Sequence, residues 1–177
     1  MFSTELYVAA LRFAAVKHAG QRVPGSELPY LVHVASVAAE VIAALPSLAL
    51  ATPDLAVQCA LLHDTVEDTA TTHDELATGF GPAVADGVQA LTKDAALAKA
   101  DRMADSLRRI RTQPREVWVV KLADRITNLA PPPTGWTREK CVAYREEAIR
   151  IADALGEAGP ALDARLRARI EAYRTYA

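Results

Sequence analysis

Apolar residues at helical spacing, divided into short segments by proline and glycine, are the feature of this sequence that most constrains its fold. In the first segment, Leu6, Ala10 and Phe13 recur on one helix face. Ser3 or Thr4 precedes them as a candidate N-cap. Ala and Leu dominate the composition and only 8 of the 177 residues are Gly, which favours helices over a turn-rich β fold. The sequence therefore predicts an all-α protein.

Capping and helix-breaking residues divide the chain into a bundle of about eight or nine helices. The expected ranges are about 4–18, 30–45, 53 to at least 66, 72–79, 82–92, 99–111, 115–130, 137–155 and 160–176. The segment 115–130 is apolar nearly all round and is ended by three prolines, which favours a place inside the bundle. No linker or repeat divides the chain, so residues 1–177 are expected to form a single domain.

Charge and hydropathy argue against several classes of partner. Twenty basic residues face 22 acidic ones, and the net charge of −2 gives no overall field that favours nucleic acid or an anionic membrane. The longest uncharged stretch, 41–53, is shorter than a bilayer span and contains Pro46. We therefore expect a soluble, cytoplasmic protein. Cys59 and Cys141 show no disulfide or metal-site spacing, and the sequence leaves open whether the chain forms a homo-oligomer.

Four side chains suited to a divalent metal lie in three separate, otherwise apolar helical segments: His33, His63 with Asp64, and Asp124. A buried carboxylate without a partner is costly, so Asp64 and Asp124 need a cation, a salt bridge or a solvated cavity. Two imidazoles and two carboxylates would leave positions open on a six-coordinate ion, as a catalytic site requires. These four residues are the candidate ligands of a divalent metal.

Three further polar residues follow candidate ligands by four positions, which places each on its ligand's face of a helix. The pairs are His63 with Glu67, Asp64 with Asp68, and Asp124 with Asn128. Glu67 and Asp68 are well placed to orient or deprotonate a water molecule. The Asn128 amide could meet a substrate hydroxyl.

The same residues lie in stretches that resemble a known family. The stretches are 17–22 (KHAGQR), 29–33 (PYLVH), 60–69 (ALLHDTVEDT), 91–93 (LTK), 120–125 (VKLADR) and 135–136 (GW), with Tyr144 eight residues after Trp136. Together they resemble the HD superfamily. Within it they are similar to the hydrolase domain of the RelA/SpoT enzymes and its small stand-alone relatives, such as the metazoan SpoT homologue. The similarity extends over residues 14–154.

The resemblance implies an HD-domain helical bundle that hydrolyses guanosine tetraphosphate or pentaphosphate at the 3′ position, with Mn²⁺ as the usual metal. The products would be pyrophosphate and GDP or GTP. Carried over residue by residue, it implies metal ligands at His33, His63, Asp64 and Asp124, catalytic acids at Glu67 and Asp68, and nucleoside contacts at Asn128 and Tyr144.

Two loops depart from the family pattern. Val23 follows Arg22 where the family carries an Arg-Lys pair, and the stretch 129–133 (LAPPP) lacks the Arg that usually follows the family's Asn. Arg22 would then recognise phosphate without the adjacent Lys, and Lys121 either faces the pocket or covers the helix surface. An HD phosphohydrolase for another nucleotide, such as the 2′-phosphate of NADPH or a nucleoside monophosphate, therefore stays open. A non-catalytic nucleotide-binding regulator would not need both Glu67 and Asp68.

Overall fold

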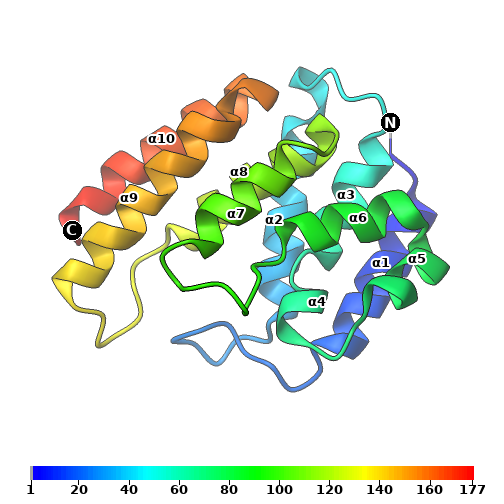
Figure 1. Ribbon diagram of the computed structural model, residues 1–177, viewed down its shortest axis with the longest axis horizontal. Helices are drawn as coiled ribbons and strands as arrows, with labels where there is room; N and C mark the ends of the chain where they lie inside the picture. The colour runs from blue at the N-terminus through cyan, green and yellow to red at the C-terminus, as the bar shows by residue number, and fades with distance from the viewer. Residues whose placement is uncertain (1) are drawn as a thin grey trace.

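The computed structural model describes residues 2–177, and Figure 1 shows them as a bundle of helices. The elements are α1 (Thr4–Lys17), α2 (Leu31–Ala44), η1 (Leu45–Ser47), α3 (Pro53–Leu62), α4 (Thr65–Asp68), α5 (His73–Phe80), α6 (Pro82–Leu91), α7 (Arg102–Ile110), α8 (Arg115–Asn128), α9 (Arg138–Leu155), η2 (Gly156–Ala158), α10 (Pro160–Ala172) and η3 (Tyr173–Thr175). Within 2–177, β structure is limited to an isolated bridge between Arg22 and Pro29. The expected all-α fold is confirmed. Among these helices, none is long and apolar enough to cross a bilayer.

Local capping signals set several helix ends. The Ser3 side chain accepts a hydrogen bond from the Leu6 N–H at 3.3 Å, and the Thr72 side chain accepts one from the Glu75 N–H at 3.2 Å. Each such cap contributes about 1 kcal/mol to helix stability. Proline occupies the first turn of α3, α6 and α10, where its missing N–H has no helical partner to lose.

Helix α8 lies at the centre of the bundle. All of its residues from Glu116 to Ile126 are buried, and it contacts α2, α3, α9 and α10. In Figure 1, α9 and α10 lie on the left of α8, and α1, α3, α5 and α6 lie on its right. The apolar character of this segment is thus explained by neighbours on all sides, and its expected central position is confirmed.

The third helix is shorter than the apolar pattern predicted. Helix α3 ends at Leu62, and a separate single turn, α4, begins at Thr65. The Thr65 hydroxyl donates to the Leu62 carbonyl at 2.7 Å, and His63 Nδ1 lies 2.8 Å from the Ala60 carbonyl. Because side chains bond these last carbonyls, the backbone can leave the helix there without unpaired polar groups. The expected continuous helix through Val66 was therefore wrong at this junction.

Candidate metal centre

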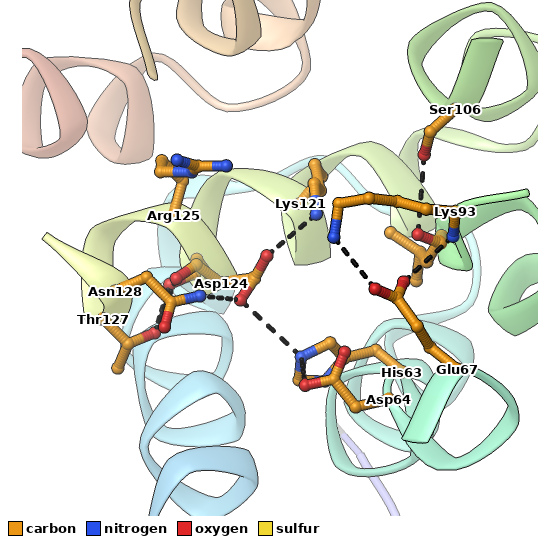
Figure 2. A network of polar contacts seen from close by, with 12 residues as sticks. His63, Asp64, Glu67, Lys93, Ser106, Lys121, Asp124, Arg125, Thr127 and Asn128 are labelled. Atoms are coloured by element: carbon orange, nitrogen blue, oxygen red, sulfur yellow. Dashed lines mark hydrogen bonds and ion pairs between the residues drawn. The ribbon is translucent and has the colours of Figure 1, made fainter. Parts of the chain in front are cut away.

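Side chains from α2, α8 and the α3–α4 junction converge on one point. His63 Nε2 lies 3.0 Å from Asp64 Oδ2 and 3.7 Å from Asp124 Oδ1, and His33 Nε2 lies 3.5 Å from each of these oxygens. Ligand atoms about 2.1 Å from a shared ion would lie about 3.0–3.4 Å apart at right to tetrahedral angles. Figure 2 shows His63 and Asp64 facing Asp124 across this point. The structure therefore brings the four candidate ligands together: the ligand atoms of His33, His63 and Asp64 all lie within 4.8 Å of one another, and Asp124 faces both histidines.

The orientation of His63 fits a metal ligand. Its Nδ1 faces the Ala60 carbonyl at 2.8 Å and must donate a hydrogen to it, because a carbonyl oxygen only accepts. Its Nε2 is buried and has no hydrogen-bond partner within residues 2–177, although two carboxylates surround it. A ring nitrogen held in this way, with its other nitrogen fixed by a backbone carbonyl, is the usual arrangement of a metal-binding histidine.

The two carboxylates favour the protonated form of the neighbouring histidines. Burial opposes a charge on His63, but the charges and hydrogen bonds of Asp64 and Asp124 together outweigh burial and raise the pKa of His63 to about 10. Burial likewise disfavours ionised Asp64, yet the charge of His63 holds the pKa of Asp64 well below its usual range. For Asp124, Lys121 outweighs burial, assisted by both histidines, and the pKa again lies well below its usual range. Both carboxylates are therefore ionised and require positive charge beside them.

Neighbouring side chains hold the two carboxylates in place. The Tyr30 hydroxyl donates to Asp64 Oδ2 at 2.5 Å, Lys121 Nζ lies 2.9 Å from Asp124 Oδ2, and the Asn128 amide donates to Asp124 Oδ1 at 2.5 Å. Figure 2 shows the Lys121 and Asn128 contacts on opposite sides of Asp124. Lys121 is only 5% exposed, so it does not cover the helix surface; it orients a candidate ligand.

The two candidate acids occupy different environments. The Asp68 N–H donates to the Asp64 carbonyl at 2.9 Å, so these residues stay one turn apart although the helix breaks before them. Desolvation, together with the charges of Asp64 and Glu67, raises the pKa of Asp68, as suits a group that exchanges protons. Glu67 turns to Lys93 instead and is bonded there by both the backbone N–H and the ammonium.

A cavity of about 460 Å³ opens beside the metal centre. Its lining includes His33, Asn128, Trp136 and Tyr144, together with residues 23–26, Leu28 and residues 130–134. Among its described lining residues there is no Lys, Arg, Asp or Glu, so the cavity suits an uncharged, planar group more than a phosphate. A larger cavity of about 690 Å³ lies between α2 and α10 but contains none of the four candidate ligands.

Tyr144 is held at the cavity by aromatic and cationic neighbours. The Arg125 guanidinium lies 4.3 Å from the centre of its ring, and the Trp136 ring packs against it edge to face at 5.2 Å. Arg125 also donates a hydrogen bond to Glu147, on the same helix as Tyr144. The ring is therefore fixed before any ligand arrives.

Arg22 lies apart from this constellation. It is not among the lining residues of the cavity, its side chain is 57% exposed, and it binds the carboxylate and the backbone carbonyl of Glu27. A role in phosphate recognition would require the side chain to leave Glu27.

Sequence reasoning missed three residues around the site: Tyr30, Lys93 and Arg125. Only Tyr30 carried a local signal, because it precedes His33 by three positions and so lies on the same side of the chain at the start of α2. Lys93 and Arg125 act through residues distant in sequence, Glu67 and Glu147, which local patterns do not reveal.

Comparisons with known proteins agree with this geometry. Residues 10–151 match the HD domain family. The chain is 35% identical to the zebrafish (Danio rerio) guanosine-3′,5′-bis(diphosphate) 3′-pyrophosphohydrolase MESH1, over 93% of this chain and 92% of that protein. It is 36% identical to the human (Homo sapiens) protein of the same name, over 82% of each. A solved structure described as a metazoan orthologue of SpoT that hydrolyses ppGpp superimposes with a TM-score of 0.84, at 29% identity and 97% coverage of both chains.

Proposed function

Because the chain belongs to the HD domain family, we propose that it is a metal-dependent hydrolase that removes pyrophosphate from the 3′ position of guanosine tetraphosphate or pentaphosphate. The observation that carries the proposal is the convergence of His33, His63, Asp64 and Asp124 beside a cavity of nucleoside size. The similarity to the zebrafish and human hydrolases over most of their lengths supports the choice of substrate.

The four converging residues would hold a divalent metal, and we propose Mn²⁺. Two imidazoles and two carboxylates form a mixed set of donors that leaves room for oxygen ligands from water and phosphate. A divalent ion bound there supplies Lewis-acid activation and neutralises developing negative charge. Tyr30, Lys121 and Asn128 would keep the carboxylates oriented toward it.

Residues of the chain would then accept a proton from the attacking water and bind the nucleoside of the substrate. A water oxygen forms a bond to the phosphorus attached to the 3′ oxygen and the P–O3′ bond breaks. One proton of the water, taken up by Asp68, passes to the departing 3′ oxygen, so the nucleotide leaves with a 3′ hydroxyl. Asp68, whose pKa is raised by desolvation and by its acidic neighbours, is suited to receive the water proton. Glu67 would orient the water, while Asn128 and Tyr144 would contact the nucleoside in the cavity.

The lining of the cavity also fits a second class of substrate, namely nucleotides other than the guanosine polyphosphates. None of its described lining residues is Lys or Arg, and Arg22 binds Glu27 instead. A related nucleotide that relies less on phosphate contacts beside its base would also fit such a cavity. NADPH and nucleoside monophosphates therefore belong in the same substrate panel as the guanosine polyphosphates.

The test is to incubate metal-free protein with guanosine tetraphosphate, with and without Mn²⁺, and to follow release of pyrophosphate and GDP. Release should require Mn²⁺ and be lost in Asp64→Ala. His73→Gln, which changes an exposed histidine outside the site, should behave as the unmodified protein does. Tight Mn²⁺ binding without any release of pyrophosphate would refute the proposed substrate, and turnover of another nucleotide in the panel would replace it.

A further inference from the structure

Lys93, the second residue after α6, holds the Glu67 carboxylate with two separate donors. Its backbone N–H donates to Oε2 at 2.9 Å, and its ammonium donates to Oε1 at 3.0 Å. Figure 2 shows both contacts, with the Lys93 side chain extended above Glu67. Because each donor takes a different oxygen, the pair fixes both the position and the rotation of the carboxylate.

The end of α6 that carries Lys93 is itself held by α7. The Arg109 guanidinium donates to the carbonyls of Gln89, Ala90 and Thr92 at 2.6, 3.0 and 2.6 Å. Asp105 fixes Arg109 at 2.7 Å. These bonds satisfy carbonyls that the helix end would otherwise leave without partners. The backbone N–H of Lys93 therefore projects from a rigid support toward Glu67.

The ammonium of Lys93 is stabilised by the carboxylates around it. Burial opposes its charge, but the charge and hydrogen bond of Glu67, together with the charges of Asp124 and Asp64, outweigh burial and raise the pKa of Lys93. Lys93 therefore stays cationic. Its side chain is 35% exposed, whereas that of Lys121 is 6% exposed, so Lys93 lies at the rim of the site and Lys121 inside it.

We propose that Lys93 is a positioning residue that sets the Glu67 carboxylate for hydrolysis. In the proposed function Glu67 would orient the attacking water, and Lys93 would act on the reaction only through Glu67. The inference rests on the proposed function, which gives Glu67 its role. A residue of this kind changes turnover more than substrate affinity, and it has no effect once Glu67 has been removed.

The experiment is a double-mutant cycle with Mn²⁺ and guanosine tetraphosphate. Lys93→Met should lower kcat about 10- to 100-fold and leave KM within about twofold, and Lys93→Arg should restore part of kcat. In the Glu67→Gln background, Lys93→Met should change kcat by less than about twofold. Losses that multiply in the double mutant, or a rise in KM at constant kcat, would overturn the inference.

Two controls separate this role from a structural one. Lys17→Met removes another Lys–Glu ion pair, to Glu75 at 2.7 Å, and should leave kcat and KM unchanged. Thermal unfolding should show that Lys93→Met and Lys93→Arg are folded proteins. The kcat values of the double-mutant cycle are compared only among variants that fold.

A readout that needs no turnover tests the contact itself. In Glu67→Ala the Lys93 amide should exchange its hydrogen about tenfold faster or more, because its acceptor is gone. An unchanged exchange rate would refute the Lys93–Glu67 contact. Absence of guanosine tetraphosphate hydrolysis by the unmodified protein would instead refute the proposed function, so the two failures are distinguishable.

Discussion

Binding of Mn²⁺ should release protons, because the metal-free site holds a proton where the ion would bind. His63 Nε2 faces two carboxylates, whose charges and hydrogen bonds together outweigh burial and raise the pKa of His63 to about 10. Burial of His33 is likewise outweighed, by hydrogen bonds to Asp124 and Asp64, so its pKa is also raised. A bound ion needs the Nε2 lone pair of His33 and that of His63, so both imidazoles must be neutral.

The sign and size of the effect follow from these shifts. A group whose pKa is raised in the metal-free protein must lose its proton on binding, so metal affinity should rise with pH until the pH passes about 10. One displaced proton lowers the Kd for Mn²⁺ about tenfold per pH unit, equivalent to about 1.4 kcal/mol. From about pH 7 to about pH 8.5, His63 alone should therefore lower the Kd about 30-fold.

Titration calorimetry in two buffers with different ionisation enthalpies measures both the Kd and the number of protons released. His73→Gln, whose imidazole lies on the surface beside Asp86, should show the same pH dependence as the unmodified protein. His63→Ala should bind more weakly and release fewer protons. A Kd that stays constant with pH, together with heats that do not depend on the buffer, would refute the claim that a proton occupies this site.

Three further predictions concern packing around the site. Leu122→Ala, at a fully buried position in α8, should lower the free energy of unfolding by about 2–5 kcal/mol in urea denaturation; a loss below about 1 kcal/mol would contradict the central packing of α8. Gly87→Ala would place a Cβ 2.8 Å from Cys59 Sγ and should cost about 1–3 kcal/mol, and adding Cys59→Ala should recover most of that loss if this contact is the cause. Gly25→Ala combines a φ of +78° with a Cβ 2.9 Å from Pro133 Cβ, so it should displace a loop of the nucleoside cavity and raise KM while kcat stays constant; an unchanged KM would separate this loop from substrate binding.

Local signals in the sequence were sufficient where one side chain decides a helix boundary. Ser3, one of the two candidate caps, does cap the first helix, and the helix expected from position 72 begins with a cap at Thr72, because an N-cap depends on only a few neighbouring residues. Helix α8 was also predictable, since an apolar surface on all sides requires neighbours on all sides. The convergence of ligands from distant segments came from the chemistry of buried carboxylates and from the family resemblance. The catalytic roles of Glu67 and Asp68 stay predictions.

Contacts between segments that are distant in sequence could not be predicted from local sequence patterns. The sequence left Lys121 either at the pocket or on the surface, and only the fold places its ammonium on Asp124. The sequence assigned Tyr30 no role at the site, yet its hydroxyl donates to Asp64, 34 positions away in sequence. Arg22 was expected to recognise phosphate, but the nearby Glu27 offers a partner within the same loop. In each case a partner outside the local pattern decides where a polar group points.

The break between α3 and α4 is the local feature that makes an adjacent His-Asp pair useful. Neighbouring residues on a continuous helix point about 100° apart, so they direct their side chains to different places. At the junction Asp64 adopts φ −99° and ψ −1°, and its Oδ2 comes within 3.0 Å of His63 Nε2. The hydrogen bond from His63 Nδ1 to the Ala60 carbonyl satisfies the end of α3 and at the same time turns Nε2 toward the carboxylates. One side chain thus ends the helix and orients a ligand, so the geometry of the metal centre depends on the same contact that interrupts the helix.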